Sequence, residues 1–245
     1  MATAESVRAK IQGLIGTANA TTGNADSDLT TAVNALVAGF GQGGENYIDY
    51  AVNGKDMFAG VVLPENVNIV LGSKHPDLEA SPYITSMFYK TSGVKNLKFD
   101  FGYKVLPCSL DTLFRGCSAE TIEAPFLETV AMTTYNRCFQ DCTNLKEIKT
   151  PINASASQSF ARCFDFDNVN NILEEVRFVS GTIRTYVSFN GSKFLSDKSI
   201  QSIIDGLADL TGSTAQTLTF NKTVGAKLTD TQKASASAKN WTISY

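Results

Sequence analysis

Five related stretches recur in the middle of the chain and decide how the rest of it is interpreted. They are ITSMFYKTSGV (84–94), LDTLFRGCSAE (110–120), YNRCFQDCTNL (135–145), FARCFDFDNVN (160–170) and TYVSFNGSKFL (185–195). Each carries a phenylalanine at the same place, and these column phenylalanines are Phe88, Phe114, Phe139, Phe164 and Phe189. They are separated by 26, 25, 25 and 25 residues. Regular self-similarity of this length is typical of units that stack on one another.

Each unit combines two hydrophobic patterns. Around the column phenylalanine, mostly apolar residues stand at offsets −4, −1, 0 and +3, as in Leu110, Leu113, Phe114 and Cys117. That spacing is typical of one face of a short helix or helical turn. Downstream, alternating apolar residues such as those within 94–101 and 122–126 indicate a short strand. One helical turn and one strand cannot bury their apolar faces alone, so the pattern predicts an α/β repeat stacked into a solenoid.

The two central units resemble a known repeat family. LFRGCSAETIEAP (113–125) and CFQDCTNLKEIKTP (138–151) are similar to BspA-type leucine-rich repeats. The family's Cys, Leu, Ile and Pro positions fall on Cys117, Cys142, Leu145, Ile148, Pro125 and Pro151. The outer units depart from the pattern, with Thr91 and Asp167 at the cysteine position. The resemblance implies a leucine-rich-repeat-like solenoid and a binding role rather than catalysis.

We expect three regions. Residues 1–45 form an N-terminal helical attachment or capping region, 46–195 the solenoid, and 196–245 a C-terminal α/β cap. In the cap, Ser196 and Thr229 are expected to begin helices, and 214–220 and 241–245 to form strands. In the N-terminal region, apolar residues fall at helical spacing. They are Val7, Ile11, Leu14 and Ile15, followed by Leu29, Val33, Leu36, Val37 and Phe40.

Both ends of the chain also resemble segments of phage proteins. The N-terminal run 7–44 is similar to a module of tail-associated proteins from phages and prophages of gut bacteria, and the C-terminal run 196–245 to a segment that follows such repeats there. This resemblance implies a virion protein assembled in the host cytoplasm. Its expected partners are other virion proteins, through the N-terminal region, and a glycan or protein of the host surface. The sequence leaves a homotrimer open.

Composition excludes several classes of function. The net charge of −3 leaves no broad basic field for nucleic acid. A single histidine, His75, excludes multi-histidine metal sites, and the five cysteines contain no CxxC pair. We therefore expect no metal, no cofactor and no catalytic residues. No apolar run is long enough to span a membrane, and the first residues lack the features of a signal peptide, so we expect neither membrane insertion nor general secretion.

Four of the five cysteines fall on repeat positions, which indicates small buried side chains. A disulfide between Cys138 and Cys163, at equivalent places in neighbouring units, stays open at this point.

The candidate binding residues are those directly after each column phenylalanine, since a stack would display them in one row. They are Tyr89, Arg115, Gln140, Asp165 and Asn190. The sequence predicts a noncatalytic phage virion structural protein in the tail or baseplate fibre, for host attachment or display. The alternatives are a bacterial BspA-like adhesin and a polysaccharide depolymerase. The latter would draw on a set of acidic residues. They are Asp141, Asp165, Asp167, Glu174 and Glu175.

Overall fold

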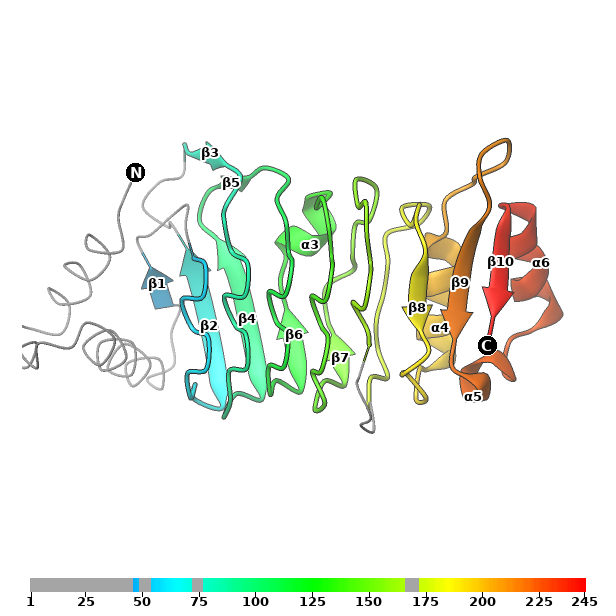
Figure 1. The fold of residues 1–245 in the computed structure, drawn as a ribbon. Coiled ribbons are helices and arrows are strands. Elements are labelled where there is room, and N and C mark those ends of the chain that lie inside the picture. The colour runs from blue at the N-terminus through cyan, green and yellow to red at the C-terminus, as the bar shows by residue number, and fades with distance from the viewer. Residues whose placement is uncertain (1–45, 49–53, 72–76, 166–171) are drawn as a thin grey trace, which may run out of the picture.

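A five-stranded parallel sheet runs through the first part of the molecule (Figure 1). The computed structural model describes residues 46–48, 54–71, 77–165 and 172–245. The sheet's strands, in spatial order, are β1 (Asn46–Ile48), β2 (Asn66–Leu71), β4 (Asn96–Phe101), β6 (Thr121–Glu123) and β7 (Glu147–Ile148). An isolated parallel bridge between Glu147 and Glu175 continues the pairing past β7.

The register of this sheet aligns equivalent positions of successive units. Asn66 pairs with Asn96, Asn96 with Thr121, and Thr121 with Glu147. Along β2 the buried residues alternate with more exposed ones, because successive side chains of a strand point to opposite faces. The strand expected from the apolar alternation within 94–101 is confirmed as β4.

The remaining strands form two smaller parallel sheets. β3 (Glu79–Ala80) pairs with β5 (Lys104–Val105). The other sheet has three strands, in the spatial order β10 (Trp241–Ser244), β9 (Gln216–Phe220) and β8 (Val187–Phe189). Figure 1 shows α4 and α6 on one side of this sheet.

The C-terminal helices begin where capping residues predict. Ser196 caps α4 (Asp197–Gly206) by accepting a hydrogen bond from the N–H of Ser199. Thr229 caps α6 (Asp230–Ala238) in a reciprocal capping box with Gln232. A short helix, α5 (Lys222–Gly225), lies between them in the chain. The predicted helix starts at Ser196 and Thr229 and the last two strands are confirmed.

The predicted fold class, an α/β leucine-rich-repeat-like solenoid with a helical turn in each unit, is wrong. The described residues hold four helices, and three of them, α4 to α6, follow Ser196. The fourth, α3 (Phe126–Thr129), follows β6 and contains no column phenylalanine. The strands are divided among three small parallel sheets rather than one repeating α/β layer.

The segments around Phe88, Phe114, Phe139 and Phe164 are turns, for a reason visible in their hydrogen bonds, whereas Phe189 lies in β8. The N–H groups of Met87 and Tyr89 donate to carbonyls within the turn, whereas that of Phe88 donates to Leu113 O of the next unit. A helix would direct all of these donors to carbonyls four residues earlier. In addition, the residues two before and two after Phe88, Phe114 and Phe139 have positive φ, which a right-handed helix does not allow. They include Ser86, Lys90, Thr112, Gly116, Arg137 and Asp141.

The column phenylalanines lie on top of one another in the core. Phe88 stacks on Phe114 at 5.5 Å between ring centroids, and Phe114 stacks on Phe139 at 5.5 Å. The stack continues through Phe164 to Phe189. Phe58 and Phe220 extend it at its two ends. We call these seven residues the Phe stack, and the surface formed by the turns around them the turn face.

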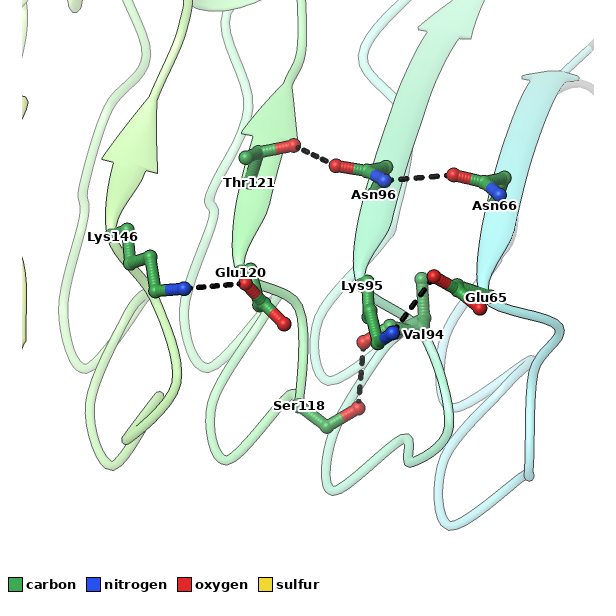
Figure 2. A network of polar contacts seen from close by, with 9 residues as sticks. All are labelled: Glu65, Asn66, Val94, Lys95, Asn96, Ser118, Glu120, Thr121 and Lys146. Atoms are coloured by element: carbon green, nitrogen blue, oxygen red, sulfur yellow. Dashed lines mark hydrogen bonds and ion pairs between the residues drawn. The ribbon is translucent and has the colours of Figure 1, made fainter.

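Polar side chains form ladders along the exposed start of the strands (Figure 2). The amide of Asn96 donates to Asn66 and accepts a hydrogen bond from Thr121. Beside it, Lys95 pairs with Glu65 at 2.8 Å and Lys146 pairs with Glu120 at 2.7 Å. Each of these pairs joins opposite charges of neighbouring units and so favours the observed alignment of their strands. Exposed ion pairs contribute little stability each, however.

The helices expected in 1–45 lie outside the residues that the structure describes, so they stay a prediction. Within the described ranges, no helix has the length and apolar character needed to cross a membrane.

Candidate functional site

The predicted row lies on the turn face, but its members have different surroundings. Tyr89, Arg115 and Asp165 are half-buried, and Asn190 is exposed. Gln140 is 0% exposed, and neither polar atom of its amide makes a hydrogen bond. Because its side chain does not reach solvent, Gln140 does not belong to an accessible binding surface in this conformation.

Tyr89 is the centre of a cluster of charged side chains. The Arg115 guanidinium lies 5.6 Å from the centroid of the Tyr89 ring, and Lys90 Nζ lies 5.2 Å from it. Arg115 Nε in turn lies 3.6 Å from a carboxylate oxygen of Asp141. A cation held over an aromatic ring and beside a carboxylate is fixed in place, so these three units present a defined polar surface.

Three of the candidate acidic residues, Asp141, Asp165 and Glu175, have separate partners. Asp165 accepts a hydrogen bond from Arg162 Nε at 2.9 Å, and Asp141 pairs with Arg115. A carboxylate oxygen of Glu175 accepts from the Ser199 hydroxyl at 3.2 Å. Asp167 lies outside the described residues, and the described part of the chain contains no group of three potential metal-binding side chains. The polysaccharide depolymerase alternative therefore stays a prediction.

A groove of about 600 Å³ opens on the turn face between the turn at 158–165 and the segment 185–191. Its described walls contain amide, hydroxyl and aromatic side chains. Its lining includes Gln158, Ser159, Phe160, Arg162, Phe164, Asp165, Thr185, Tyr186, Ser188, Asn190 and Gln216. The volume lies within the range of about 300–1,000 Å³ that is common for small-molecule sites.

The groove lies where the backbone pairing between successive units is interrupted. The N–H groups of Tyr135, Arg137 and Phe139 donate to carbonyls of the next turn, at Ser159, Ala161 and Cys163. No such backbone hydrogen bond joins the described residues 158–165 to 185–191. The reason is that 187–189 forms the extended strand β8, which pairs with β9 on its other side. The turn at 158–165 therefore faces a strand rather than another turn, and the groove lies between the two.

Several contacts fix the far wall of the groove. The N–H of Tyr186 donates to the Gln216 side-chain oxygen at 3.0 Å. The Asn190 carbonyl accepts from the side-chain amide of Asn221 at 2.7 Å. Thr185 Oγ1 is buried without a hydrogen-bond partner at the same place. The site is thus held by β9 and the residues that follow it.

The row of binding residues predicted from the sequence includes two residues of this groove, Asp165 and Asn190. It does not include Tyr186, Gln158 or Gln216. Tyr186 lies three residues before its column phenylalanine, where the other units have Thr85, Asp111, Asn136 and Ala161. The signal that could have identified Tyr186 was therefore an aromatic residue at a position that is small or polar in the other units. Gln216 had none, because it comes from another strand.

All five cysteines are buried and free, so Cys138 and Cys163 form no disulfide in this structure. Burial raises the pKa of the Cys138 and Cys142 thiols well above its usual value. The Cys142 thiol donates to Phe114 O of the preceding unit at 2.9 Å. These cysteines are neutral core side chains, and buried neutral thiols are poor nucleophiles.

Comparison with family models finds no match, and no curated protein or solved structure matches the chain either. The similarity of the central units to BspA-type repeats therefore stays a prediction.

Proposed function

We propose that this chain is a noncatalytic structural protein of a phage virion that attaches the tail or baseplate fibre to the host surface through the turn face. The observation that carries the proposal is the presence on the turn face of both the Tyr89–Arg115–Asp141 cluster and the groove beside Asp165. Two features of the sequence support the virion assignment: the N-terminal run and the C-terminal run both resemble segments of phage tail proteins.

A stack of parallel units suits a polymeric ligand. Beneath the turn face, the rings of Phe88, Phe114 and Phe139 recur at 5.5 Å, so equivalent side chains of successive units recur at a similar spacing. A surface glycan presents chemical groups that also repeat along its length. Several weak contacts at regular spacing then add to an overall avidity that one contact does not provide.

The charge of the chain favours this ligand class over nucleic acid. The net charge is −3, and several cationic side chains on the turn face have acidic or aromatic neighbours, such as Asp141 beside Arg115. A phosphate backbone requires a field of unneutralised cations. In this proposal the N-terminal region binds other virion proteins, and assembly takes place in the host cytoplasm.

The test is binding of the fluorescently labelled full chain to a panel of gut bacterial strains. We expect strain-selective binding that falls strongly in Tyr89→Ala/Arg115→Ala. Lys98→Ala, on the exposed face of β4, is the matched control because Lys98 pairs with Glu123 away from the turns. Reducing sugar released from bound cells should stay at background. Absence of binding to every strain, or equal loss with Lys98→Ala, contradicts attachment through the turn face.

A further inference from the structure

The groove between 158–165 and 185–191 differs from the rest of the turn face because it is concave. We propose that it is a binding subsite for an uncharged saccharide unit. This inference rests on the proposed attachment function and names the ligand class and the residues at one place on the turn face.

The charges that line the groove compensate each other. Among the described lining residues, Arg162 and Asp165 are the charged ones, and they form an ion pair at 2.9 Å. An acidic saccharide would need a cation that does not already have a carboxylate beside it. A cationic ligand would meet the guanidinium of the same pair. A neutral ligand is therefore the best match to the electrostatics of the groove.

Tyr186 supplies an apolar surface of the right kind. Its side chain is 47% exposed, although it belongs to the wall of the groove. The backbone of this residue is held by the bond from its N–H to Gln216. The face of a sugar ring that bears C–H groups packs on an aromatic side chain, whereas its hydroxyls need polar partners. Phe160 and Phe164 also line the groove, but they are 2% and 1% exposed, so Tyr186 is the aromatic side chain there that a ligand can reach.

The polar groups of the groove match the hydrogen bonding of hydroxyls. Gln216 uses its side-chain oxygen for Tyr186, which leaves its NH2 group as a donor to a ligand. The side-chain amides of Gln158 and Asn190 provide both donors and acceptors. A ligand hydroxyl, which both donates and accepts, can satisfy each of these groups, and that requirement selects a polyol over a purely apolar ligand.

The test uses the full chain and an array of defined oligosaccharides. The neutral probes are tetrasaccharides of glucose, galactose, mannose and N-acetylglucosamine, and the acidic probe is oligogalacturonate. We expect binding of at least one neutral probe, with affinity about tenfold weaker in Tyr186→Ala by isothermal titration calorimetry. Tyr186→Phe keeps the ring and should bind like the unmodified chain.

Tyr83→Ala is the matched control. Tyr83 is 50% exposed and also lies on the turn face, but in the unit of Phe88, three units away from the groove. Circular dichroism spectra and thermal unfolding of all variants confirm that each is folded. Equal weakening by Tyr83→Ala and Tyr186→Ala, binding of oligogalacturonate alone, or no binding of any neutral probe overturns the proposal.

The outcome is separable from that of the proposed function. Cell attachment that is unaffected by Tyr186→Ala, without oligosaccharide binding, leaves host attachment in place and refutes the saccharide subsite. Binding of a neutral probe that depends on Tyr186, without attachment to any strain, supports the subsite and refutes the host-attachment role.

Discussion

Thr91 Oγ1 lies 3.1 Å from the sulfur of Cys117, and the two residues occupy the same place, three residues after a column phenylalanine, in neighbouring units. The Thr91 hydroxyl also lies 3.0 Å from Phe88 O. Thr91, at the cysteine position of its unit, therefore keeps a small buried group that hydrogen-bonds within the core. The position requires a compact side chain able to donate, rather than a cysteine as such.

This relationship predicts the effect of replacing Thr91. Thr91→Val keeps the shape but removes the donor, which leaves Phe88 O without this bond and should lower the free energy of unfolding by about 1 kcal/mol. Thr91→Cys should be closer to the unmodified protein, since the thiol of Cys142, at the same position of its unit, also donates to a backbone carbonyl, that of Phe114 in the preceding unit. Urea unfolding followed by circular dichroism measures both, and a valine variant as stable as the unmodified chain contradicts the argument.

Phe139 lies in the middle of the Phe stack, 5.5 Å from the Phe114 ring and 5.7 Å from the Phe164 ring. Phe139→Ala removes a fully buried ring and leaves a cavity between two others, so it should cost about 3–5 kcal/mol in unfolding free energy. Phe194→Ala is the control, because that ring is 52% exposed. Its effect should stay within about 0.5 kcal/mol in the same urea titration. Similar losses in the two variants would rule out the stack as the main apolar core.

Gly93 is required by both its backbone conformation and its surroundings. Its φ is +81°, and a Cβ atom there would lie 2.4 Å from the Leu63 carbonyl oxygen. Gly93→Ala should therefore lower the free energy of unfolding by about 2–3 kcal/mol. Gly60 has a φ of +71° with open space around it, so Gly60→Ala should cost only about 1 kcal/mol. Thermal unfolding of the pair separates steric contact from backbone strain, and equal losses would contradict the contact with Leu63.

The buried thiol of Cys108 should make the protein less stable in alkaline solution. Burial raises the pKa of its thiol from 9.0 to about 12. Between these values the unfolded chain has released the thiol proton and the folded protein has kept it, so unfolding is favoured as pH rises through this range. Below pH 9 the thiol keeps its proton in both the folded and the unfolded state, so the loss of stability is absent there. Urea unfolding at about pH 8 and about pH 10 should show a smaller decline for Cys108→Ala than for the unmodified protein. An identical decline would assign the effect to other groups.

The two residues that bound the candidate groove show how far sequence reasoning reaches. Asp165 and Asn190 are predicted to share one surface because each follows a column phenylalanine, and a regular period is visible in the chain itself. Tyr186 stands out only after comparison with the equivalent positions of the other units. Gln216 is 30 residues from Tyr186 and contacts it because β9 pairs with β8. No local pattern indicates such a contact.

Local patterns in the sequence were sufficient for the repeat period, the buried alternation of β4 and the helix starts at Ser196 and Thr229. These features depend on neighbouring residues, through side-chain alternation and through caps that bond within three residues. The tertiary structure decided whether the segments around the column phenylalanines form helices or turns. Their spacing fits both, and turns result because the N–H groups of residues such as Phe88 bond to the next unit. It also decided that Gln140 is buried and that a groove opens beside Asp165, since both depend on what the adjacent unit places against them.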